Sequence, residues 1–129
     1  MFEFDKAIAF HREKFVPISE ATVSIANSGF LYGLGVFTGM RANYNKSDGK
    51  LYLFRPYDHH KRLMNSAKLM RYANFLRDYA DPEKFVSVLK ELLTKNQITS
   101  DAYLRITIFS DENKVTPKLL YADSWSAYI

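Results

Sequence analysis

The strict alternation of residues 102–109 constrains the fold of this chain more than any other feature of its sequence. The segment is Ala-Tyr-Leu-Arg-Ile-Thr-Ile-Phe. Because successive side chains of a β-strand point to opposite faces of a sheet, one face is wholly apolar and the other is mixed. The apolar face consists of Ala102, Leu104, Ile106 and Ile108, and the mixed face of Tyr103, Arg105, Thr107 and Phe109. The pattern therefore predicts a β-strand.

A second strand is predicted over residues 35–44. Its two-residue period places Phe37, Gly39, Arg41 and Asn43 together on one face. A turn follows at 45–50, where Gly49 can supply a positive φ, and residues 51–54 form a plausible return strand. We therefore expect a hairpin in this part of the chain.

Shorter strands are predicted near both ends. Residues 7–10 and 14–18 form a pair around a polar turn, and 22–25 is a candidate third strand before a break at 27–29. A final strand is predicted at 125–129.

Two helices are expected between the strands. The first begins near Pro56, and the second has Asp81 as its N-cap and Pro82 as its first residue. The inward stripes are His60, Leu63, Ala67 and Met70 in the first helix, and Phe85, Val88, Leu89, Leu92 and Leu93 in the second. Leu69 and Tyr72 lie off the first stripe and suggest that this helix is covered on a second side.

Strands, two helices and then further strands define an α+β fold with an antiparallel sheet. The length of 129 residues corresponds to one domain. We therefore expect residues 1–129 to form a single small domain.

Composition excludes several classes of site and partner. The chain has no cysteine, so neither a disulfide nor a Cys-ligated metal site can form, which fits a cytoplasmic protein. Adjacent His59 and His60 point in different directions on a helix, so no metal site is expected. No secretory signal or apolar run of about 20 residues is present, so no membrane span is expected. The net charge is +4 with scattered basic residues, which argues against nucleic-acid binding.

Two strands carry an aromatic residue and an arginine on one face, where a plain core would need neither. These are Phe37 with Arg41 and Tyr103 with Arg105, and Gly39 leaves room for a ligand or another backbone. The planar donors of arginine suit a carboxylate or phosphate. The face is interpreted as the floor of a site for an anionic, partly apolar molecule, or alternatively as a solvent-facing sheet surface.

Residues 59–62, His-His-Lys-Arg, form a cationic cluster near a predicted helix start. Such a cluster is a candidate phosphate site, or alternatively a solvated face with one packed histidine. No nucleophile elbow, dinucleotide fingerprint or P-loop is present.

Three segments together resemble the class IV (fold type IV) pyridoxal-phosphate aminotransferases of the branched-chain type. Residues 31–42, Leu-Tyr-Gly-Leu-Gly-Val-Phe-Thr-Gly-Met-Arg-Ala, resemble the family's Tyr-Gly-x-x-Val-Phe-Glu-Gly-Ile-Arg-Ala. Residues 53–68 resemble its Phe-Arg-x-x-x-His-x-x-Arg-Leu-x-x-Ser-Ala-Lys, and 102–105 its Ala-Tyr-Ile-Arg. The order and spacing of the three make the resemblance specific, and it runs from about residue 8 onward.

The resemblance implies functions for particular residues. Arg62 would bind the phosphate of pyridoxal 5'-phosphate. Tyr32 would reach the site of a neighbouring subunit, which implies a homodimer. The substrate would contact Phe37, Gly39, Arg41, Tyr103 and Arg105, with Arg105 helping to recognise a glutamate side-chain carboxylate.

The resemblance also implies what this chain lacks. The family carries its Schiff-base lysine in a second, larger domain, so this chain is expected to be the small amino-terminal domain and inactive alone. Lys84, Lys90 and Lys95 lie on a polar helix face, where a lysine is a poor nucleophile.

The implied activity is amino-group transfer between a branched-chain amino acid and 2-oxoglutarate. Thr38 replaces the family's common Glu, and a Phe-Thr pair is also similar to aminodeoxychorismate lyases. A D-amino-acid aminotransferase of the same fold is a further candidate. A non-enzymatic binding or oligomerisation domain is the candidate from a different functional class.

Overall fold

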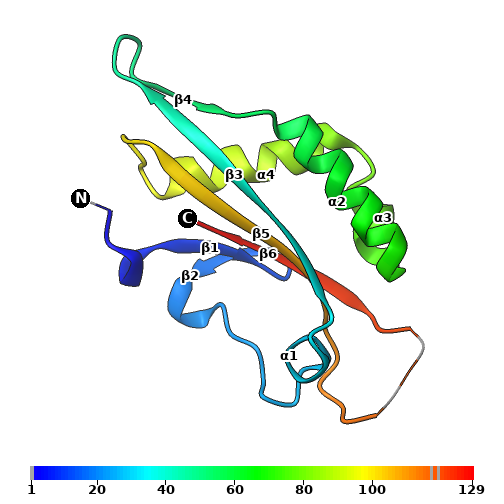
Figure 1. Cartoon of the computed structure of the whole chain (residues 1–129). Helices are drawn as coiled ribbons and strands as arrows, with labels where there is room; N and C mark the ends of the chain where they lie inside the picture. Colours follow the sequence, from blue (N-terminus) through cyan, green and yellow to red (C-terminus); the bar gives the residue numbers. More distant parts are fainter. Residues whose placement is uncertain (1, 117, 119) are drawn as a thin grey trace.

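The computed structural model describes residues 2–116, 118 and 120–129, and is built on one antiparallel sheet of six strands (Figure 1). The strand order across the sheet is β2-β1-β6-β5-β3-β4. The strands are β1 (Ile8–His11), β2 (Lys14–Pro17), β3 (Gly35–Asn45), β4 (Lys50–Leu53), β5 (Ala102–Ser110) and β6 (Asp123–Tyr128). The predicted α+β fold with an antiparallel sheet is confirmed.

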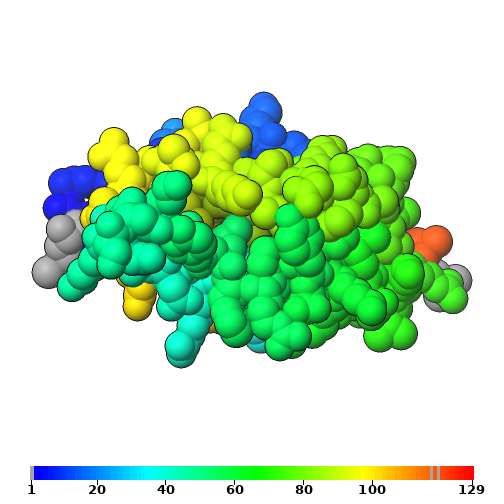
Figure 2. All heavy atoms as spheres, turned by 90° about the horizontal axis from the view of Figure 1, so that it is seen from above, coloured from blue at the N-terminus to red at the C-terminus, as the bar shows by residue number. Residues whose placement is uncertain are grey.

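Helices cover one face of the sheet. The α-helices are α1 (Ser28–Tyr32), α2 (Pro56–Met70), α3 (Ala73–Asp78) and α4 (Pro82–Lys95), with short 3-10 helices η1 (Phe4–Lys6) and η2 (Ile18–Glu20). In Figure 1, α4 lies behind the long β3 and β5 strands, α2 and α3 lie beside them at the right, and α1 lies apart at the lower end. Figure 2 shows α2 and α4 forming one continuous surface beside the β3–β4 hairpin.

The core lies between this helical layer and the sheet. The even-numbered side chains of β5, Leu104, Ile106 and Ile108, are fully buried there, as their alternation predicted. The α4 helix begins as predicted, because the Asp81 side chain accepts a hydrogen bond from the Glu83 N–H at 2.9 Å. The side-chain alternation of β5 and the N-cap of α4 therefore predicted these two elements correctly.

One local prediction was wrong, and one short helix was not predicted. Residues 22–25 form no strand, and the Thr22 carbonyl instead accepts a hydrogen bond from the Arg12 side chain. The break predicted at 27–29 coincides with the start of the short α1 helix. The side chain of Asn27 accepts hydrogen bonds from the N–H groups of Gly29 and Phe30, which satisfies the free donors of the first turn.

The sequence predicted that the first helix is packed against the protein on a second side, and this packing is only partly present. Leu69 is 86% exposed, whereas Tyr72 lies in the core just beyond α2. The additional helix α3 contributes the buried Phe75 to the same core. Within the described ranges, no helix has both the length and the apolar character required to cross a bilayer.

Candidate functional site

The open face of the sheet brings together most of the predicted site residues, on β3 and β5. The register pairs Arg41 with Tyr103 and Gly39 with Arg105. Phe37 is 51% exposed and Tyr103 is 54% exposed, although both are large and apolar. The guanidinium of Arg105 lies 3.3 Å from the centre of the Phe37 ring, a cation–π contact. This aromatic-cationic face is therefore assembled from two strands that are far apart along the chain.

Gly39 lies under the side chain of Tyr103. A Cβ at this position would overlap the ring of Tyr103, so the missing side chain leaves room for that tyrosine. The Tyr103 ring thus lies across β3 over Gly39. The face therefore carries the Phe37 ring under the Arg105 guanidinium and the Tyr103 ring over Gly39.

Arg62 lies on the other side of β3, on the second turn of α2. Its Nη2 donates a hydrogen bond of 2.7 Å to the Thr38 hydroxyl, which is completely buried. The same Oγ1 is 2.8 Å from Nδ1 of His59. The guanidinium of Arg62 remains exposed, so its other N–H donors are accessible.

The two adjacent histidines have different environments. Burial lowers the pKa of His59, and the charge of Arg62 lowers it further. His60 is buried, and its Nε2 lies 2.7 Å from the Tyr79 carbonyl oxygen. His60 is therefore a packed core histidine, while His59 belongs to the cluster around Arg62.

Tyr32 lies at the end of α1, away from the aromatic-cationic face. It is 42% exposed, and its ring centre is 6.3 Å from that of Tyr121. The structure therefore does not bring Tyr32 together with the other predicted site residues of the same chain.

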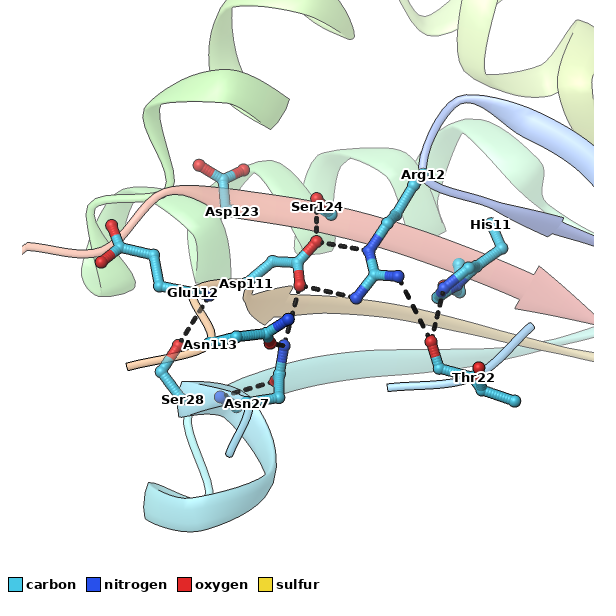
Figure 3. A network of polar contacts seen from close by, with 12 residues as sticks. His11, Arg12, Thr22, Asn27, Ser28, Asp111, Glu112, Asn113, Asp123 and Ser124 are labelled. Carbon is cyan, nitrogen blue, oxygen red and sulfur yellow. Dashed lines mark hydrogen bonds and ion pairs between the residues drawn. The ribbon is translucent and has the colours of Figure 1, made fainter. Parts of the chain in front are cut away.

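A polar network anchors the α1 segment that carries Tyr32 (Figure 3). The Asp111 carboxylate accepts two hydrogen bonds from Arg12, at 2.6 and 2.8 Å. It also accepts from Nδ2 of Asn27 at 2.8 Å and from the Ser124 hydroxyl at 2.7 Å. Because Asn27 also caps α1, the network links the β1–β2 turn, α1 and the end of β5.

The network also shifts the pKa of its carboxylate. Partial burial alone would raise the pKa of Asp111. The hydrogen bonds from Arg12, Ser124 and Asn27 outweigh that effect and hold the pKa below its ordinary value. The carboxylate therefore stays charged in the folded chain and retains all four hydrogen bonds.

Sequence reasoning missed Thr38 as the hydrogen-bond partner of Arg62 and of His59. The only signal was a hydroxyl at residue 38 on the otherwise apolar face of β3, next to Met40 and Ala42. The exposed guanidinium of Arg62, with its free donors, lies on one side of β3. The aromatic-cationic face lies on the other side and can contact an apolar group and a carboxylate. Among the described residues, no group of three or more acidic or histidine side chains is arranged to hold a metal ion.

The chain is similar in sequence and fold to known proteins, although no protein-family model matches it. A probable branched-chain-amino-acid aminotransferase of Aquifex aeolicus is 34% identical over 117 residues, covering 91% of this chain and 36% of that protein. The branched-chain aminotransferase of Thermoproteus uzoniensis, solved with norvaline, has a TM-score of 0.81 at 26% identity, over 95% of this chain and 40% of that one.

The T.th. branched-chain amino acid aminotransferase, solved with pyridoxamine 5'-phosphate, has a TM-score of 0.79 at 26% identity. That match covers 98% of this chain and 40% of the other. The chain thus spans little more than a third of the length of the proteins it resembles.

Proposed function

Because sequence and fold identify this chain as a relative of the branched-chain aminotransferases, we propose that it is the small domain of such an enzyme. The activity would be transfer of an amino group between leucine, isoleucine or valine and 2-oxoglutarate. The observation that carries this proposal is the arrangement around β3, with Arg62 held by Thr38 on one side and Phe37 beneath Arg105 on the other.

The exposed donors fit the phosphate of pyridoxal 5'-phosphate. One Nη2–H of Arg62 is engaged by Thr38, and the remaining guanidinium donors suit a phosphate group. A relative solved with pyridoxamine 5'-phosphate supports this cofactor. When bound, the cofactor supplies the electron sink for chemistry at the amino acid α-carbon. Arg62 would hold its phosphate.

The aromatic-cationic face would bind and orient the substrate. Phe37 offers an exposed apolar surface to a branched side chain, and packing there would exclude water. Arg105 and Arg41 provide donors for carboxylates, and the contact with the Phe37 ring limits the orientations of Arg105. Tyr103, packed over Gly39, would form one wall of this subsite.

We propose that the reactive lysine lies in a second, larger domain, and that the 129-residue chain alone does not catalyse transamination. Lys84, Lys90 and Lys95 are exposed on α4, on the helical layer and away from the aromatic-cationic face. We also propose a homodimer in which Tyr32 contacts the neighbouring subunit's site, and a cytoplasmic location, which the cysteine-free sequence favours.

The test compares the 129-residue chain with the product of its complete coding region. Leucine-dependent formation of glutamate from 2-oxoglutarate should occur with the longer product and not with the shorter. Arg62→Ala should reduce cofactor affinity in the active protein, while Lys61→Ala, one residue away and exposed, should not. A substrate panel with D-alanine and aminodeoxychorismate separates the two same-fold candidates, since only one donor class should react.

Lack of turnover with every donor would reject the enzymatic proposal. A binding or oligomerisation domain would then be the better interpretation. Turnover by the 129-residue chain itself, verified by mass, would reject the proposal that the lysine lies elsewhere.

A further inference from the structure

We propose that Thr38 is a positioning residue that holds the Arg62 guanidinium ready for a phosphate monoester, with His59 as the second partner of its hydroxyl. The inference deepens the proposed function and rests on it. It assigns a role to the buried hydroxyl on the helix-facing side of β3. The three side chains come from β3 and α2 and meet in one place.

The count of protons sets the direction of each hydrogen bond. A guanidinium is only a donor, so the Thr38 oxygen must accept from Nη2 of Arg62. The single proton of the hydroxyl is then available for Nδ1 of His59, which lies 2.8 Å away. The proposal therefore assigns His59 the neutral form with its proton on Nε2, which agrees with the lowered pKa of this histidine.

Burial makes this arrangement selective for one orientation of Arg62. Thr38 is completely buried within β3, so its hydroxyl cannot turn to water if either partner leaves. Arg62 is exposed, and among the described residues its side chain makes no other hydrogen bond. The buried hydroxyl thus fixes one end of the guanidinium and leaves the other N–H groups pointing outward.

A fixed guanidinium binds an anion more tightly than a free one. An arginine side chain has many rotamers, and a ligand that must first restrict it to one rotamer binds more weakly. In this structure Thr38 already restricts the Arg62 side chain before any anion binds. The neutral state of His59 also keeps a second positive charge away from Arg62, so the two side chains do not repel each other.

The test uses inorganic phosphate and three variants of the 129-residue chain. Thr38→Val removes the hydroxyl with almost no change of shape, and Thr38→Ser retains it. Thr107→Val on the neighbouring strand β5 is the control, because Thr107 is half-buried on the opposite face. Phosphate affinity, followed through the Arg62 Nε resonance, should fall about tenfold in Thr38→Val. It should stay within about twofold in the other two variants.

A second readout does not depend on phosphate or on turnover. The ¹⁵N shifts of the His59 ring should show an unprotonated, accepting Nδ1 in the unmodified chain and in Thr38→Ser. That signature should weaken in Thr38→Val. A merely structural role for Thr38 would leave the tautomer unchanged in a folded variant.

Each contrary result overturns the inference. A proton on Nδ1 of His59 in the unmodified chain would do so without any variant having to fold. Unchanged phosphate affinity in Thr38→Val would also overturn it. So would an unmodified chain that does not bind phosphate. Failure of the aminotransferase assay with these readouts intact would reject the proposed function alone.

Discussion

Replacing Asp111 by asparagine should destabilise the chain far more than its partly exposed position suggests. The carboxylate accepts four hydrogen bonds, two at each oxygen (Figure 3). Asparagine has the same shape but only one acceptor oxygen. Whichever way the amide is turned, its NH₂ group faces at least one donor of Arg12, which cannot accept.

The magnitude follows from these contacts. A hydrogen bond to a charged group contributes about 1.5–3 kcal/mol. At least one such bond is lost, and the others lose their charge assistance. The Arg12 side chain is 38% exposed and can turn partly to water, which reduces the cost. We therefore expect a loss of about 2 kcal/mol in the free energy of unfolding, or roughly 8 °C in Tm for a chain of this size.

The assay is urea unfolding with linear extrapolation, with Asp101→Asn as the matched control. The Asp101 side chain accepts one hydrogen bond, from the backbone N–H of Tyr44, which an asparagine oxygen can still accept. The control should lose less than about 0.5 kcal/mol. In Asp111→Asn, amide exchange at Gly29 and Phe30 should also accelerate, because the Asn27 cap loses its anchor. Equal stability of the two variants would refute the reasoning.

Three further outcomes are expected. The folded-state pKa of Asp111 is depressed, so its contribution to stability is present above the unfolded-state pKa of about 3.9 and declines as the pH falls through the folded value. Urea titrations between about pH 6 and 3 should therefore show the difference from Asp111→Asn shrinking in acid. Leu104→Ala should cost about 2–5 kcal/mol of unfolding free energy, because Leu104 is fully buried. Leu69→Ala should cost less than about 0.5 kcal/mol, and similar values for the two would contradict the assigned core. Gly39→Ala should displace the exposed Tyr103 ring at a cost below about 1 kcal/mol, seen as a shifted ring resonance with little change in the urea midpoint. An unshifted ring would contradict the packing of Tyr103 over Gly39.

Several elements could be predicted because their signals are local. The alternation of β5 and the Asp81 cap of α4 are contained in a few consecutive residues. The α1 helix was missed because its cap, Asn27, also suits a break, and only its contact with Asp111 separates the two outcomes. The packing over Gly39 could not be predicted for a similar reason, since the ring that uses the space comes from Tyr103 on another strand.

The sequence by itself determined the fold class, the two faces of β3 and β5, and the resemblance that points to Arg62. Each of these depends on side-chain period, on short motifs, or on the order of such segments along the chain. Only the tertiary structure decided the strand order, the joining of Arg12 to Asp111, and the meeting of Thr38 with Arg62. These contacts join residues that are far apart along the chain, and their geometry is set when the buried faces of sheet and helices pack into one core.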